Sequence, residues 1–322
     1  MENEEILKKI SGKKILLVGN LILEDNIMGK AKRISYEAPV PLIDVKSKNA
    51  RLGASGNIAR SIKELGSTPY VLGVVGKDDA SRKIISLFEE YGILSNYIIS
   101  DHDRPTSKIT RVSAGGQYIS IIAEGLHNGL NQTAIDKLMK YYEQLIPEVD
   151  AVIVSDTGNI FLTEEMMYFF NKKAKEHNKP LFVRPHQDKK HYYMDSEIVV
   201  CTLEEAYQMA EIRTDHIEKV GEVLTEYLNS NVVIDRLEKG AIYFNKHGNV
   251  IEINQHIRNA VDVTGARSTF LGVLVLCLAG GVDIETALKV AKKSEEISFS
   301  KLGSVHITPA ELRNSLARIG MR

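Results

Sequence analysis

The sequence has only two cysteines and no long apolar segment. Cys201 and Cys277 each lie within an apolar run, which indicates buried thiols rather than a disulfide framework and predicts a reducing, cytoplasmic setting. The longest apolar run, residues 271–279, is too short to cross a bilayer. The acidic N-terminal stretch lacks the apolar core of a signal peptide. We therefore expect no membrane role.

The sequence also lacks an excess of charge of either sign. Its 41 basic and 42 acidic residues give a formal net charge of -1, so nothing favours binding to nucleic acid or to an anionic membrane. A small-molecule or protein partner is expected instead. No repeat or low-complexity linker interrupts the 322 residues, of which 43% are hydrophobic. We expect one α/β domain, residues 1–322, with a small lid.

A phosphate-binding P-loop is missing as well, because residues 73–77 (Gly-Val-Val-Gly-Lys) lack the required spacing. A different phosphate seat is predicted at residues 261–272, where a strand end, a glycine turn and an apolar helix follow one another. The first turn of such a helix directs free N–H groups and the positive end of its dipole at one point. We expect the functional centre there.

The chain begins with a buried strand at residues 15–19, and further short apolar runs predict a mostly parallel sheet. Ligands bind beyond the carboxyl ends of such strands, which makes Asn20 and Glu24 candidates. Two segments, at about residues 20–45 and 105–123, read as lid strands because one contains prolines typical of an edge and the other forms a hairpin.

The turn at residues 261–268, Val-Asp-Val-Thr-Gly-Ala-Arg-Ser, resembles the Asp-Thr-Gly-Ala-Gly-Asp signature of the ribokinase-like (PfkB) carbohydrate kinases. The resemblance runs from Ile15 to Leu316 and implies a three-layer α/β/α fold with a β-strand lid. Residues 33–41, Arg-Ile-Ser-Tyr-Glu-Ala-Pro-Val-Pro, are similar to the D-glycero-β-D-manno-heptose-7-phosphate kinase branch. Only the kinase half of the bifunctional members is matched.

The resemblance implies that Gly265, Ala266 and Arg267 form the anion-hole turn and that Ser268 occupies the place of the catalytic aspartate. A serine hydroxyl is no general base near neutral pH, and loss of a positioned base costs about 10²–10⁴-fold in rate. Arg267 stands where the family has glycine. It either carries a Cβ penalty of about 1–2 kcal/mol, if the backbone there has positive φ, or its guanidinium fills the anion hole.

The implied substrate residues are Asn57, in a turn similar to Gly-Gly-Ala-Ala-Asn-Val-Ala, and Asn20 and Glu24, at positions where the family has aspartates. Lys108 and Arg111 match charged positions of the heptose kinase branch, with a spacing one residue longer. Two cations near the sugar suit a substrate phosphate. The alternative is an exposed hairpin face.

The resemblance also implies ATP and Mg²⁺ as ligands. Two segments are similar to the nucleotide-binding motifs of the family: Thr-Leu-Glu-Glu at residues 202–205 and Asp-Arg-Leu-Glu-Lys-Gly at residues 235–240. The implied nucleotide and magnesium residues are Thr202, Glu205, Arg236, Glu238 and Gly240. Thr202 replaces the asparagine that helps to order magnesium. The alternative for Arg236 and Glu238 is a surface pair beside a hairpin.

Two further family positions have changed type, since Arg184 and His186 stand where the family has aspartate and lysine. His186, Asp188 and His191 could be imagined as metal ligands. Their spacing fits no helical ligand pattern and favours a polar loop, so no metal site is predicted there.

These changes leave three hypotheses. The first is a non-catalytic homologue, a pseudokinase, that binds a sugar phosphate or a nucleotide. The second is an active ATP-dependent carbohydrate kinase in which Asp262 or Asp156 serves as the base. The third, compatible with both, is a structural or regulatory homodimer that pairs through the lid strands.

Overall fold

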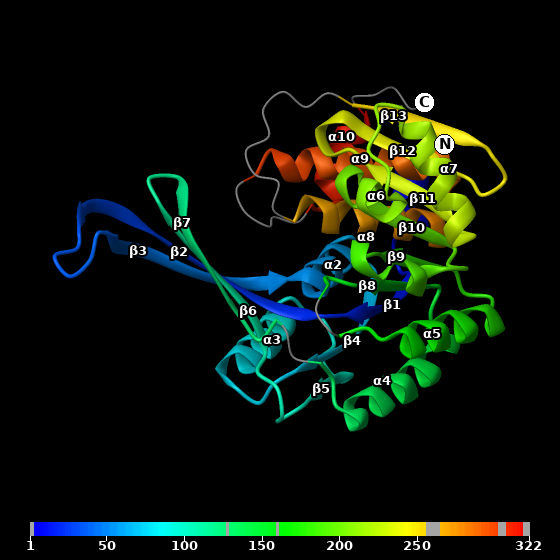
Figure 1. The fold of residues 1–322 in the computed structure, drawn as a ribbon. Helices are drawn as coiled ribbons and strands as arrows, with labels where there is room; N and C mark the ends of the chain where they lie inside the picture. The colour runs from blue at the N-terminus through cyan, green and yellow to red at the C-terminus, as the bar shows by residue number, and fades with distance from the viewer. Residues whose placement is uncertain (1–2, 127–128, 159–160, 256–264, 302–306, 318–322) are drawn as a thin grey trace.

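The computed structural model describes residues 3–126, 129–158, 161–255, 265–301 and 307–317. Within this part of the chain a nine-stranded sheet forms the centre of the molecule (Figure 1). Its strands, in order across the sheet, are β13 (Val250–Asn254), β12 (Gly240–Phe244), β11 (Asn231–Asp235), β10 (Ile198–Thr202), β9 (Leu181–Arg184), β8 (Ala151–Ser155), β1 (Lys14–Gly19), β4 (Thr68–Val75) and β5 (Ile98–Ser100).

All of these strands run in the same direction except β12, which is antiparallel to both β11 and β13 and forms a hairpin with β13 at one edge. Strands such as β8 and β11 are buried along their whole length, since helices cover both faces of the sheet. The predicted three-layer α/β/α fold with a mostly parallel sheet is confirmed.

Two hydrophobic cores lie on the two faces of the sheet. The helices that contribute to the first core are α1 (Asn3–Ile10), α2 (Ala54–Glu64), α3 (Asp79–Glu90), α8 (Ala266–Ala279), α9 (Ile284–Phe299) and α10 (Pro309–Ala317). Those of the second core are α4 (Gln132–Leu145), α5 (Glu164–Glu176), α6 (Leu203–Ala210) and α7 (Ile217–Leu228). Short 3₁₀ helices are η1 (Ile146–Glu148), η2 (Gln187–Tyr193) and η3 (Leu237–Lys239).

Helix α8 is apolar on all sides because it lies between α2, α9 and the sheet (Figure 1). Its N-terminal end therefore has a fixed position relative to the strands. Both predicted buried thiols are confirmed, with Cys201 on β10 and Cys277 on α8. The cytoplasmic setting stays a prediction.

In the described ranges, no helix combines the length and the apolar character needed to span a membrane.

The lid is a separate four-stranded sheet that extends away from the body of the molecule (Figure 1). Its strands, in order, are β3 (Pro41–Gly53), β2 (Leu21–Ile34), β6 (Ser107–Ala114) and β7 (Gln117–Glu124). Pro41 begins the edge strand β3, as its missing N–H requires. The lid is longer than the predicted residues 20–45, because β3 continues up to the first residue of α2.

Gly240 supplies a stability test of the β12–β13 hairpin. Its φ is +107°, and a Cβ atom there would lie 1.9 Å from the carbonyl oxygen of Ile253. Gly240→Ala should therefore lower the free energy of unfolding by at least about 2 kcal/mol. Urea unfolding followed by circular dichroism measures the change.

The matched control is Gly248→Ala in the turn of the same hairpin. Gly248 also has positive φ (+94°), but a Cβ there would meet nothing within 4 Å. Gly248→Ala should therefore lower the free energy of unfolding only by the backbone strain of positive φ, about 1 kcal/mol. Equal losses in the two variants would contradict the steric explanation.

Candidate active site

The carboxyl ends of adjacent parallel strands bring the polar residues of the candidate site together. Gly19 of β1 pairs with Ser155 of β8, which pairs with Arg184 of β9, so these strands end at one edge. Thr202 of β10 and Asp235 of β11 are likewise register partners. The predicted site edge is thus built by the parallel sheet itself.

The glycine turn before α8 ends at the same edge. Gly265 is the N-cap of α8 with φ 85°, and Ala266 is the first helical residue. Arg267 and Ser268 follow in the first turn, and Ser268 is buried. The positive φ belongs to Gly265 and not to Arg267, so the Cβ penalty considered for Arg267 does not arise.

The guanidinium of Arg267 binds Glu205 of α6. Its Nη2 donates to both carboxylate oxygens, at 2.9 Å to Oε1 and 2.7 Å to Oε2. Glu205 also accepts a 2.8 Å hydrogen bond from the N–H of Thr202, which with the reciprocal bond forms the capping box of α6. Burial favours the neutral carboxyl, but Arg267 and the Thr202 N–H outweigh it and hold the pKa of Glu205 below its ordinary value.

Magnesium does not fit this arrangement. Glu205, the carboxylate that the family resemblance assigns to magnesium, has both oxygens engaged by Arg267, and the hydroxyl of Thr202 accepts from the Glu205 N–H. Across the described residues, no cluster of three or more histidine, cysteine or acidic side chains could hold a metal. A hard divalent cation needs several oxygen ligands that are not already paired with a cation.

Arg184 brings a second guanidinium to the same place. It lines a cavity of about 10 Å³ together with Arg267, Cys201, Asp235 and Phe270. A volume of this size is at the lower limit for one water molecule. Burial, with the nearby charge of Arg267, lowers the pKa of Arg184 to about 10, so it remains protonated at neutral pH.

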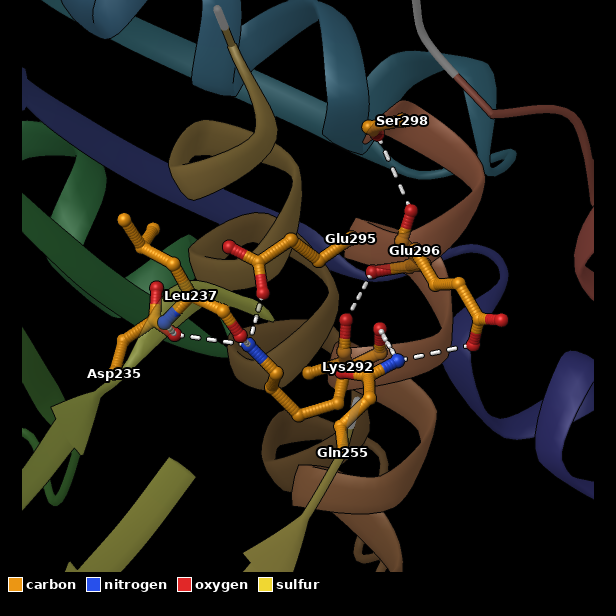
Figure 2. A network of polar contacts seen from close by, with 9 residues as sticks. Asp235, Leu237, Gln255, Lys292, Glu295, Glu296 and Ser298 are labelled. Atoms are coloured by element: carbon orange, nitrogen blue, oxygen red, sulfur yellow. Dashed lines mark hydrogen bonds and ion pairs between the residues drawn. The ribbon is translucent and has the colours of Figure 1, made fainter. Parts of the chain in front are cut away.

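A buried ion network joins α9 to the end of β11 (Figure 2). The Nζ of Lys292 donates to Asp235 Oδ1 at 2.9 Å and to the Leu237 carbonyl at 2.7 Å, and it also contacts the Glu295 carboxylate. Its ammonium lies 5.3 Å from the ring centre of Phe270. Lys292, Asp235 and Glu295 are all at most 3% exposed.

Sequence reasoning missed this network. Lys292 and Glu295 are three residues apart on α9, which places them on the same side of the helix. Small buried neighbours, Ala291, Ser294 and Ser298, mark that side as the packed one. This pattern was the available signal, but the partner Asp235 is more than fifty residues away in the sequence.

Three of the five predicted nucleotide residues, Arg236, Glu238 and Gly240, lie in the connection from β11 to β12. Arg236 pairs with Glu252 (2.9 Å) and donates to Asn254 (3.2 Å) on β13. Glu238 lies in η3 and Gly240 begins β12. The alternative interpretation of Arg236 as part of a surface pair therefore holds with Glu252 as its partner, not Glu238.

The predicted sugar side has buried oxygen atoms without hydrogen-bond partners. Asn20 follows β1, Asn57 lies in α2, and Ser55 precedes Asn57 by one half-turn. Their Oδ1 and Oγ atoms are buried, and among the described residues they have no hydrogen-bond partner. Buried polar atoms are normally satisfied, which makes these three atoms candidates for contact with a ligand.

Two arginines contact one carboxylate oxygen of Glu24 on β2. Arg111 Nη1 lies 3.0 Å and Arg51 Nε 3.3 Å from its Oε2 atom. Arg51, on the neighbouring strand β3, was missed by sequence reasoning, since only the antiparallel register places it opposite Glu24.

Lys108 and Arg111 lie on opposite faces of the lid and pair with different carboxylates. Lys108 pairs with Asp25 (3.3 Å) and Glu124 (3.5 Å), whereas Arg111 pairs with Glu24. Glu24 and Asp25 are consecutive on β2 and point to opposite faces of the lid. The spacing of three residues on β6 separates the two cations in the same way.

Asp156, considered as a replacement base, has three partners. Its Oδ2 accepts from the Tyr193 hydroxyl at 2.8 Å and from Lys189 Nζ at 3.2 Å, and its Oδ1 accepts from the Gly158 N–H at 2.9 Å. The second candidate base, Asp262, lies outside the described residues.

The three residues considered as metal ligands lie in and around η2. The His186 Nδ1 is 3.6 Å from the Asp188 carboxylate, and the His191 ring packs edge-on against Tyr192, with the ring centres 4.5 Å apart.

The sequence profile of the pfkB family carbohydrate kinases matches residues 17–311, nearly the whole chain. The chain belongs to the pfkB family. Among curated proteins it is 29% identical to the bifunctional protein HldE of Trichlorobacter lovleyi over 96% of this chain and 64% of that protein. It is 31% identical to HldE of Geobacter sulfurreducens over 94% and 62%. The chain thus spans less than two thirds of the length of these relatives.

Solved structures show the same fold. Arabidopsis thaliana ribokinase, complexed with ribose and ATP, superimposes with a TM-score of 0.74 at 17% identity, over 95% of this chain and 99% of that one. Escherichia coli phosphofructokinase-2, in complex with potassium, gives 0.76 at 14% identity, over 96% and 99%. The predicted ribokinase-like fold is confirmed, as is the resemblance to the heptose kinase branch through the HldE relatives.

The buried network of this PfkB chain predicts a pH dependence of stability. Burial, and next the charge of Asp235, raises the pKa of Glu295 from 4.5 to about 8. Between these values the folded chain keeps a proton that the unfolded chain has released. The free energy of unfolding should therefore fall as pH rises through this window, by up to about 1.4 kcal/mol per pH unit from this group.

Glu295→Gln removes this titration, because glutamine stays neutral. The stability of the variant relative to the natural protein should increase between about pH 5 and about pH 8 and then level off. Urea unfolding at several pH values measures it. Glu296→Gln is the control, since that side chain is 41% exposed on the same turn of α9. If the difference in free energy of unfolding between Glu295→Gln and the natural protein did not change with pH, the raised pKa of Glu295 would be contradicted.

Proposed function

We propose that this PfkB-family protein binds a phosphorylated sugar and does not phosphorylate it. The observation that carries the proposal is the ion pair between Arg267 and Glu205. It places a side-chain cation on the carboxylate that would otherwise help to hold magnesium. A kinase needs that metal to bring the transferred phosphoryl group into position and to neutralise its charge.

The position of the base supports the same conclusion. Ser268, at the family's aspartate position, has no carboxylate with which to accept the proton of a sugar hydroxyl. Asp156 accepts bonds from Tyr193, Lys189 and Gly158, which gives it a structural role beneath the site. An active kinase with a different base therefore has no support from Asp156.

Binding of a sugar is supported by the buried oxygen atoms of Asn20, Asn57 and Ser55 at the end of β1 and the start of α2. The HldE relatives and the motif at residues 33–41 favour a seven-carbon sugar phosphate as the ligand. Nucleotide binding through Arg236, Glu238 and Gly240 is a less favoured proposal, because Arg236 is already paired with Glu252.

The test is phosphoryl transfer from ATP, with Mg²⁺ present, to D-glycero-D-manno-heptose 7-phosphate and to a panel of other sugars. We expect no ADP formation above the rate without protein, and no change in Ser268→Ala, since a serine supplies no base. Coupled measurement of ADP gives the rate. Clear turnover that disappears in Ser268→Ala would contradict the proposal.

A reverse substitution sharpens this test. The double variant Arg267→Gly, Ser268→Asp frees Glu205 and returns a carboxylate to the base position, so it should gain Mg²⁺-dependent binding of ATP, measured by calorimetry. The single variant Ser268→Asp keeps the Arg267–Glu205 pair and should not gain it. Equal ATP binding by the natural protein would show that the pair is no obstacle to the metal.

We further propose that the protein forms a homodimer through the lid. Both faces of β7 are exposed, and the lid presents large apolar side chains to solvent. These exposed residues are Met28, Ile34, Tyr36, Val40, Leu42, Val45, Tyr118, Ile119, Ile121 and Ile122. A thin sheet with this much exposed apolar surface is typical of a protein–protein contact, and a second lid offers the same surface.

Sedimentation tests the dimer. Ile121→Lys, at a side chain that is 59% exposed, should shift a dimer toward monomer at micromolar concentration, because the new charge would have to be buried. Tyr168→Lys on α5, where the side chain is 70% exposed, is the matched control and should leave the mass unchanged. A natural protein that sediments as a monomer would rule the dimer out.

A further inference from the structure

Arg184 differs from the other charged groups at the carboxyl edge of the sheet. It is partly buried at the end of β9, and among the described residues its guanidinium has no hydrogen-bond or ion-pair partner. The charges that act on it come from Arg267, Glu205 and Glu24. A partly desolvated guanidinium without a partner is costly, so its presence needs a physical reason.

The carboxylates near Arg184 cannot neutralise it, because other cations already bind them. Glu205 holds Arg267, and Glu24 holds both Arg51 and Arg111. Four guanidinium groups therefore face two carboxylates, which leaves two positive charges in excess. One of these charges is on Arg184, and the other is on the group that Arg51, Arg111 and Glu24 form.

We propose that Arg184 is the seat of a phosphate monoester dianion, bound without any divalent cation. The proposal rests on the proposed binding of a phosphorylated sugar and adds the residue that recognises its phosphate. A dianion matches the excess of two charges, and a guanidinium presents the planar pair of donors that suits phosphate oxygens. Arg51 and Arg111, which share the one carboxylate of Glu24, supply the second positive charge, so no metal is needed for charge balance.

The position of Arg184 suits a ligand whose sugar end is held at Asn20. Arg184 ends β9 and Asn20 follows β1, and β8 lies between these two strands. Strands two places apart are separated by about 10 Å. A phosphorylated sugar of six or seven carbons spans such a distance, with its hydroxyls at the unpaired oxygens of Asn20 and Asn57.

The experiment is calorimetric binding of D-glycero-D-manno-heptose 7-phosphate, and separately of the same heptose without phosphate, in excess EDTA and in Mg²⁺. We expect equal affinity for the phosphate ester in both buffers. Arg184→Ala should weaken it by about 10- to 100-fold, the usual effect of losing a charged hydrogen bond. The affinity for the plain heptose should not change. Arg184→Lys keeps the charge but not the planar donors, so it should lose less affinity for the ester than Arg184→Ala does.

Two controls separate this site from general effects. Arg313 on α10 forms an exposed ion pair with Glu4 on α1. Arg313→Ala should leave the affinities for the ester and for the plain heptose unchanged. Melting temperatures measured by circular dichroism show whether each variant folds. If Arg184→Ala does not fold, Arg184→Lys serves as the test variant. Inorganic phosphate in EDTA should compete with the ester but not with the plain heptose.

Three outcomes would overturn the inference. The first is that binding of the ester requires Mg²⁺. The second is that Arg184→Ala loses affinity equally for the ester and for the plain heptose, and the third is that both Arg184 variants keep the full affinity for the ester. In each of these cases sugar-phosphate binding without phosphoryl transfer still stands. ATP-dependent turnover, by contrast, overturns the proposed function and leaves the assignment of Arg184 intact. Absence of binding to the natural protein overturns both.

Discussion

The ion pair between Arg267 and Glu205 determines how charge is arranged at the carboxyl edge of the sheet. It joins the first turn of α8 to the first turn of α6, and through Glu205 it is continuous with the capping box of α6. An isolated charge at a partly buried place is unfavourable, so each partner requires the other. The pair therefore defines which other charges can be present around it.

A second internal pairing lies deeper. Lys292 binds Asp235, Glu295 and the Leu237 carbonyl between α9 and β11, so the acid at the end of β11 already has its cation (Figure 2). The chain thus uses its own side chains for charge balance at an edge where a kinase would use a metal and a phosphate chain. Arg184 is the exception, and its unmatched charge points to an anion supplied from outside.

The lid links these features to assembly. One face of the lid holds Glu24 between Arg51 and Arg111, whereas Lys108 pairs with Asp25 on the opposite face. The same two-residue alternation leaves apolar side chains of β7 on both faces in solvent. The lid sheet therefore has two features. It carries the charged group of Glu24, Arg51 and Arg111, and it carries the apolar surface through which we expect two copies to pair.

The sequence by itself determined the parallel sheet, the order of helices, the glycine turn before α8 and the family, because these depend on local patterns and on motif spacing. It also identified Ser268 and Arg267 as replacements. Only the tertiary structure decided where the charges go. Arg267 pairs with Glu205, Lys108 and Arg111 lie on opposite faces of the lid, and Lys292 pairs with Asp235. Each of these results depends on which distant segments lie side by side, and the free energy of a buried charge depends on those neighbours rather than on its own sequence context.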